Sequence, residues 1–247
     1  MSSSINFKNI LVVGVGLIGG SIIRALKESS YSGGVYAIDS DKRAVTSAYD
    51  LGFIQNKDSN IPNDLDDLLV IFSVPVLSIQ EAMSQINIMI NAKNVIYTDT
   101  LSVKSSILNT LKTLDEIVLK RFVLSHPIAG SEQSGFKASS ATLFKEKLSI
   151  ICPHENNSEE DVSKVEGFWE ALGSYTKKLS ANDHDELFGK TSHMPHVIAY
   201  ALMDSLYQDL GKKTFLYSGG SLEDYTRIAS SDPITVSYTH LTLPTKA

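Results

Sequence analysis

One stretch near the start of the sequence, ILVVGVGLIGGS at residues 10–21, restricts the possible folds more than any other. An apolar run typical of a buried strand leads into glycines spaced G-x-G-x-x-G and then into a helical pattern. In this spacing the first glycine (Gly14) permits a tight turn, the second (Gly16) lets the backbone approach a pyrophosphate, and the third (Gly19) lets the helix pack against the strand. The stretch therefore predicts a strand–turn–helix unit that binds a dinucleotide.

The helix expected over residues 17–27 starts at this loop. The N–H groups of its first turn, including those of Leu17 and Ile18, have no acceptor within the helix. The helix dipole adds partial positive charge at the same end, so these groups are expected to bind the phosphates.

The first part of the chain alternates apolar runs with helical patterns. Strands are expected at NILVVG, GVYAID, DLLVIFSV, KNVIYTDT, RFVLSH and KLSIICP, with helices at 17–27, 41–51, 79–90 and 104–111 between them. Strands that are apolar on both faces and separated by helices are typical of a parallel sheet covered on both sides. We therefore predict an α/β fold, with a doubly wound Rossmann domain over residues 1–153.

The second part of the chain has a different pattern. HENNSEED is typical of a polar connector, and VEGFWEAL and SHMPHVIAYALMDSL are amphipathic helical runs. This predicts a mostly helical domain over residues 154–234. The last stretch, TVSYTHLTLPTKA, has no continuous helical period, and we interpret residues 235–247 as a non-native tail that leaves the helical domain incomplete. A native disordered tail is the alternative.

An acidic residue ends the second predicted strand and bears on the choice of cofactor. Asp39 follows the run VYAI, about 20 residues after Gly19 as the dinucleotide fingerprint requires. Its carboxylate can accept hydrogen bonds from ribose hydroxyls and would repel a 2′-phosphate, which favours NAD over NADP. Lys42 and Arg43 follow closely and could contact a phosphate, so NADP is the alternative.

Three further strand ends carry polar or turn-forming residues, and ligands of open parallel sheets bind at such ends. Ser73, Val74 and Pro75 follow the third strand and could wall the nicotinamide side of the cofactor. Ser102 follows the fourth strand as a site residue or as the N-cap of the next helix. His126 ends the fifth strand within LSHPIAGSEQSG, where a neutral imidazole could accept a hydroxyl proton during hydride transfer.

The helical part offers further candidates. His193 and His196 are three residues apart and can share a helix face. A metal site is one interpretation, but Pro195 disturbs this turn and no cysteine accompanies the pair, so we expect no metal. Arg227 could bind a substrate carboxylate through two parallel hydrogen bonds, although a surface ion pair is the commoner role of an arginine.

Composition limits the possible partners. The net charge is −6, the sequence pI is about 5.5 and no basic stretch stands out, which excludes nucleic acid and anionic membranes as expected partners. No segment has the apolar length of a membrane span. The single cysteine, Cys152, cannot form an internal disulfide, which fits a reducing, cytoplasmic location.

Together these residues resemble the prephenate/arogenate dehydrogenase family of tyrosine biosynthesis. The matching motifs are, in order, GVGLIGGS, SVPV, TDTLSVK, HPIAGSEQSG, HD, SHMPH and TRIASSDP. They run from about Asn9 to Ile234. The resemblance implies an N-terminal Rossmann domain and a C-terminal helical domain that forms a homodimer in the full-length protein. It also implies NAD-dependent oxidative decarboxylation of prephenate to 4-hydroxyphenylpyruvate, of arogenate to tyrosine, or of both.

The resemblance also assigns roles to individual residues. It implies that His126 assists deprotonation of the ring hydroxyl and that Ser102 orients His126. It places His196, Arg227 and Glu132 at the small-molecule substrate, with Arg227 on a carboxylate. One departure is Leu101, because the family usually has a small residue at that position.

Two other functions are compatible with a Rossmann domain. One is a two-domain dehydrogenase of the β-hydroxy acid type, which needs a catalytic lysine early in its second domain; Lys190 is the near candidate, but it lacks Gly-rich surroundings. The other is a nucleotide-binding module that binds NADH without turnover.

Overall fold

The computed structural model describes residues 5–58, 60–62, 64–89, 94–131, 133–213 and 219–230. Contacts divide the chain into two compact units, Met1–His184 and Asp185–Ala247. We call the first the sheet unit and the second the helical unit.

The sheet unit is built on one seven-stranded sheet. Its strands, in the order β2-β1-β3-β4-β5-β6-β7, are β2 (Gly34–Ile38), β1 (Asn9–Val13), β3 (Leu68–Phe72), β4 (Val95–Asp99), β5 (Phe122–Pro127), β6 (Leu148–Cys152) and β7 (Tyr175–Lys178). Neighbouring strands are parallel except for β5 and β6, which pair antiparallel. Each predicted strand is present, and the predicted α/β class with a doubly wound sheet is confirmed.

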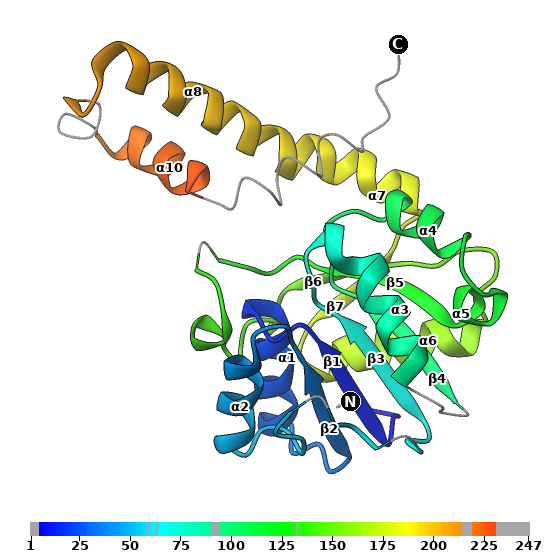
Figure 1. Cartoon of the computed structure of the whole chain (residues 1–247). Coiled ribbons are helices and arrows are strands. Elements are labelled where there is room, and N and C mark those ends of the chain that lie inside the picture. Colours follow the sequence, from blue (N-terminus) through cyan, green and yellow to red (C-terminus); the bar gives the residue numbers. More distant parts are fainter. Residues whose placement is uncertain are drawn as a thin grey trace. The chain divides into compact units, whose positions relative to one another are not determined.

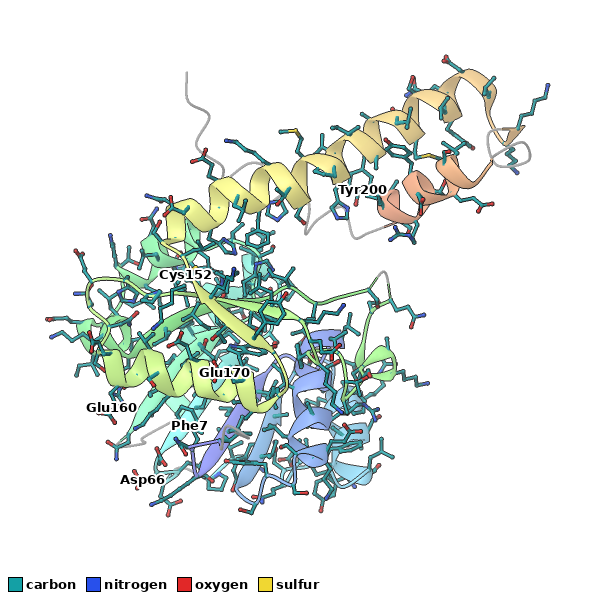
Figure 2. All side chains as sticks on the ribbon, turned by 180° about the vertical axis from the view of Figure 1, so that it is seen from behind. Phe7, Asp66, Cys152, Glu160, Glu170 and Tyr200 are labelled. Carbon is teal, nitrogen blue, oxygen red and sulfur yellow. The ribbon has the colours of Figure 1, made fainter. Side chains whose placement is uncertain are left out.

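Helices cover both faces of this sheet. They are α1 (Leu17–Glu28), α2 (Lys42–Asp50), α3 (Ile79–Met89), α4 (Ser105–Leu111), α5 (Glu116–Arg121) and α6 (Glu159–Ala171), with short 3₁₀ turns at Val76–Ser78 and Phe136–Ala138. Figure 1 shows α3 in front of the sheet, and Figure 2, from behind, shows α6 in front of it. One core cluster joins α1, α2 and α6 to the sheet through buried side chains that include Ile22, Val45 and Trp169.

The sheet unit extends further along the chain than the sequence predicts. The predicted boundary follows residue 153, whereas α6 and β7 both belong to the sheet unit, which runs to His184. HENNSEED is the N-terminal signal of α6: the Ser158 side chain accepts a hydrogen bond from the Asp161 amide at 3.1 Å, and three acidic residues occupy the first turn. A polar cluster that caps a helix therefore resembled a linker between domains.

The helical unit contains α8 (Met194–Leu210) and α10 (Gly220–Ala229), and a π-helical turn at Gly189–His193 joins α8 to α7 (Ala181–Phe188). The Thr226 hydroxyl lies 3.7 Å from the Met203 sulfur, which links α10 to α8. The predicted helical pattern of this part is confirmed. Among the described residues, no helix is long and apolar enough to cross a membrane.

Candidate active site

A cavity of about 310 Å³ opens at the carboxyl ends of β1, β2 and β3. Most of the predicted cofactor residues line it, namely Gly14, Gly16, Asp39, Ser73, Val74 and Pro75. Its other walls are Val13, Ile38 and Ser40 at the strand ends, and Ser78, Glu81, Ala82 and Gln85 on and before α3. The sequence did not indicate this second group, because the approach of α3 to β1 and β2 is a property of the tertiary fold.

The three glycines of the loop have different physical roles. Gly14 has a φ of +97°, and a Cβ there would lie 2.4 Å from the Ser73 carbonyl oxygen. A Cβ on Gly19 would lie 1.9 Å from the Gly14 carbonyl oxygen, so α1 can approach β1 only without a side chain here. A Cβ on Gly16 would meet nothing within 4 Å. The space above Gly16 is therefore open to a ligand.

The start of α1 fits a phosphate group. Gly16 is its N-cap and has no side chain to cap the helix, and the first turn contains no acidic residue. Leu17 and Ile18, which we predicted as cofactor residues, form this first turn without lining the cavity. Their contribution would come from the backbone N–H groups, which retain the partial positive charge of an uncapped helix end.

Asp39 connects the end of β2 to the glycine loop. Its Oδ2 accepts a hydrogen bond from the Val15 amide at 2.5 Å, and its Oδ1 accepts one from the Asp41 amide at 2.7 Å. The carboxylate is thus held at the cavity wall. Arg43 instead forms a bidentate pair with Asp41, at 3.0 and 3.1 Å, and its side chain is 92% exposed. Arg43 is thus already paired, which weakens the case for a 2′-phosphate.

His126 lies at the end of β5 opposite Ile150 of β6. Its Nδ1 lies 2.8 Å from Nε2 of His184, and the two rings meet at 63°. His184 is fully buried on α7, while His126 is half-buried. Our sequence reasoning gave no role to His184. The only sequence feature at His184 was the dipeptide HD, and nothing in the sequence indicates that this histidine lies beside His126, 58 positions away.

A buried polar network lies beside His126. The Lys104 ammonium and the Asp99 carboxylate are both fully buried and form an ion pair, and Lys104 Nζ also donates to the Ser125 carbonyl at 2.6 Å. Asp99 further accepts a hydrogen bond from the Ser125 amide at 3.1 Å. Burial raises the pKa of Asp99, while Lys104 and the backbone donors oppose that shift. The network ties the end of β4 to the residue that precedes His126.

Ser102 lies in the turn between β4 and α4. Helix α4 begins at Ser105 with Lys104 as its N-cap, so the interpretation of Ser102 as an N-cap is wrong. A hydrogen bond between Ser102 and His126 is not among those of the described residues, and His126 instead pairs with His184. Leu101 is buried in this turn and its amide donates to Asp99 at 3.1 Å, so the turn accommodates the larger side chain.

Two predicted substrate residues are close to each other in the helical unit. His196 on α8 places Nδ1 3.3 Å from the Ile228 carbonyl oxygen on α10, next to Arg227. The Arg227 side chain is 61% exposed and lies 3.6 Å from Asp224. Glu132 and residues 235–247 lie outside the described residues.

Family models match almost the whole chain. The model described as "Prephenate dehydrogenase, nucleotide-binding domain" matches residues 22–178, and "Prephenate dehydrogenase, dimerization domain" matches residues 180–242. The second match includes part of the segment that we interpret as a tail.

Similar proteins carry related names. A cyclohexadienyl dehydrogenase of Zymomonas mobilis is 35% identical over 92% of this chain and 78% of its own length. A prephenate dehydrogenase of Bacillus subtilis is 31% identical over 91% of this chain, which spans 61% of that protein. The crystal structure of prephenate dehydrogenase from Aquifex aeolicus, with hydroxyphenyl propionate and NAD+, has a TM-score of 0.84 and 33% identity, over 96% of this chain and 83% of that one. This chain belongs to the prephenate dehydrogenase family.

Proposed function

We propose that this protein is an NAD-dependent dehydrogenase that oxidises and decarboxylates prephenate, arogenate or both. The observation that carries the proposal is the cavity in which the glycine loop, Asp39 and the end of β3 converge, in a chain that is 33% identical to a prephenate dehydrogenase solved with NAD+. The names of the relatives, prephenate dehydrogenase and cyclohexadienyl dehydrogenase, support this substrate class.

Bound NAD+ would accept a hydride from the ring carbon that carries the hydroxyl, while the substrate loses carbon dioxide and its ring becomes aromatic. The residues of this chain hold the reactants and move one proton. Because Nδ1 of His126 is engaged by His184, we assign the hydroxyl proton to Nε2 of His126. The proton returns to the oxygen of the phenol product, so that the reaction yields one carbon dioxide and one NADH for each substrate.

Substrate recognition is proposed for the second set of residues. Arg227 would bind a carboxylate with its guanidinium, because its side chain is 61% exposed and its contact with Asp224 is as long as 3.6 Å. His196 and Glu132 complete this proposed set, while Ser102 is proposed to orient His126 and the hydroxyl during catalysis.

Cofactor choice and assembly complete the proposal. NAD is favoured over NADP because the Asp39 carboxylate stands at the cavity wall and Arg43 is paired with Asp41. A homodimer is proposed from the match of residues 180–242 to the dimerization domain. The rival catalytic lysine, Lys190, forms an exposed ion pair with Glu186 at 2.7 Å, which does not favour the β-hydroxy acid alternative.

The test is NADH formation, followed at 340 nm, with prephenate and arogenate in parallel and with NAD and NADP. We expect turnover with NAD, and the ratio of the two rates identifies the preferred substrate. His126→Asn should lower kcat by roughly a hundredfold or more while leaving the Kd for NADH almost unchanged. A folded protein that binds NADH but turns over neither compound would refute the proposed reaction, and an unchanged kcat in His126→Asn would remove His126 from it.

A further inference from the structure

The pair formed by His126 and His184 joins two elements far apart in the sequence. Nδ1 of His126 and Nε2 of His184 are 2.8 Å apart, with ring centroids at 5.1 Å. Two neutral imidazoles at this distance share one proton, so one nitrogen donates and the other accepts. Which nitrogen donates determines what His126 can do chemically.

The proton between the two rings has two possible positions. If Nδ1 of His126 carries the proton and donates to His184, then Nε2 of His126 has a lone pair and can accept a proton. If His184 donates instead, Nδ1 of His126 is the acceptor and its proton resides on Nε2, where it blocks a base. Only the first arrangement is compatible with deprotonation of a substrate hydroxyl by Nε2.

We propose that His184 is a positioning residue that accepts the Nδ1 proton of His126 and thereby holds the Nε2 lone pair ready for the substrate hydroxyl. The inference rests on the proposed function and adds a residue to it. When Nε2 takes the hydroxyl proton, His126 becomes an imidazolium whose Nδ1 proton stays donated to His184. No other proton moves, and the proton on Nε2 returns to the product oxygen.

The surroundings hold the backbones of both histidines in place. His184 is fully buried, and its amide donates to the carbonyl of Ser180, the residue before α7, at 2.9 Å. Helix α7 is tied to α4 by a hydrogen bond of 3.0 Å between Ser105 and Asn182. The backbone of His126 is held by its pairing with Ile150 on β6. A fixed backbone limits the reorganisation that the ring needs during the reaction, which is the condition for a useful positioning residue.

The first test reads the tautomer directly. Protein labelled with ¹⁵N at histidine is studied by NMR above pH 8, and the His126 signals are assigned by their loss in His126→Asn. We expect a protonated Nδ1 and an unprotonated Nε2, with a coupling partner in His184. A protonated Nε2 in the wild-type protein, with and without NADH, would overturn the inference, and this result does not depend on activity.

The second test compares two variants at the same position. His184→Leu removes the acceptor, and we expect kcat to fall roughly tenfold or more, which is part of the roughly 10²- to 10⁴-fold that a positioned base supplies. The KM for the substrate and the Kd for NADH should change less than kcat. His184→Gln offers an amide oxygen as acceptor and should recover most of the lost rate.

A purely structural role predicts a different pattern. In that case the kcat of each variant would follow its thermal stability. His184→Gln would then recover activity only to the extent that it recovers stability. Failure of the proposed function is recognised separately, because a protein without turnover on either substrate would still report the tautomer of His126 by NMR.

Discussion

Gly16 and Gly19 are three residues apart, but a methyl group added to each would meet different surroundings. At Gly19 the new Cβ would lie 1.9 Å from the backbone oxygen of Gly14, whereas at Gly16 it would meet no atom within 4 Å. Gly19 is required by packing within the protein. Gly16 is required only if a ligand occupies the open space, so substitutions at the two positions separate an effect on folding from an effect on binding.

We expect Gly19→Ala to lower the free energy of unfolding by about 1–3 kcal/mol or more, since backbone atoms must move apart. Gly16→Ala should change stability by less than about 0.5 kcal/mol and should raise the Kd for NADH. Thermal denaturation and fluorescence titration with NADH measure the two effects. NADH binding at wild-type strength by Gly16→Ala would show that no phosphate approaches this backbone.

The residues of the loop were predictable because their roles follow from local spacing. Gly14, Gly16 and Asp39 line the cavity as the strand–turn–helix motif requires. The partner of His126 was not predictable in the same way, because His184 belongs to a helix whose position depends on the packing of the whole sheet unit. A single sequence shows which side chains can take part in a reaction. It shows less readily which of those side chains are in contact in the folded protein.

At the scale of elements, the ends of β4 and β5 are joined by a buried ion pair. Asp99 and Lys104 are both fully buried, and Lys104 also donates to the Ser125 carbonyl. Removing one partner of such a pair leaves an uncompensated charge, which costs much more than replacing both partners. The pair therefore specifies the relative position of β4, which ends before Ser102, and β5, which carries His126 near its end.

Lys104→Met should lower the free energy of unfolding by about 3–5 kcal/mol because it leaves Asp99 buried without its partner. The double variant with Asp99→Asn should recover a large part of that loss. Urea denaturation followed by the fluorescence of the one tryptophan, Trp169, reports on the sheet unit. If the single and double variants were equally unstable, the ion pair would not be the cause of the loss.

The strands that sequence reasoning found share one property, and the strand that it missed lacks it. The residues of β3 (LLVIF) and of β4 (VIYTD) are all buried. β7, with the sequence YTKK, has no buried side chain and is only four residues long. Its strand conformation comes from pairing with β6 rather than from its own pattern, so periodicity could not reveal it.

In the whole molecule, the proposed cofactor residues and two of the proposed substrate residues belong to different units. The cofactor cavity is formed entirely by residues of the sheet unit, while His196 and Arg227 belong to the helical unit. This division predicts that substitutions in the two units affect different kinetic constants. The sequence indicated both groups by their motifs, but it placed the boundary too early because α6 begins with a polar capping segment.

Arg227→Ala should raise the KM for the substrate by roughly tenfold, with a smaller change in kcat, because the lost contact binds ground state and transition state alike. The Kd for NADH should not change. Steady-state kinetics with the preferred substrate and a separate NADH titration distinguish the constants, and Arg227→Lys serves as the matched control that keeps the charge. A change confined to cofactor affinity would place Arg227 elsewhere.

The short strand β7 also has a consequence for the synthesis of the protein. β6 consists of the apolar run LSIIC, and until residue 178 leaves the ribosome its outer edge has no partner. Such an edge is a template for pairing with another nascent chain. β7 closes it and presents Lys177 and Lys178 instead, two charges that disfavour any further strand. The last strand of the sheet thus protects the β6 edge against aggregation. A chain whose synthesis stalls before β7 would keep that edge unpaired and would be prone to self-association.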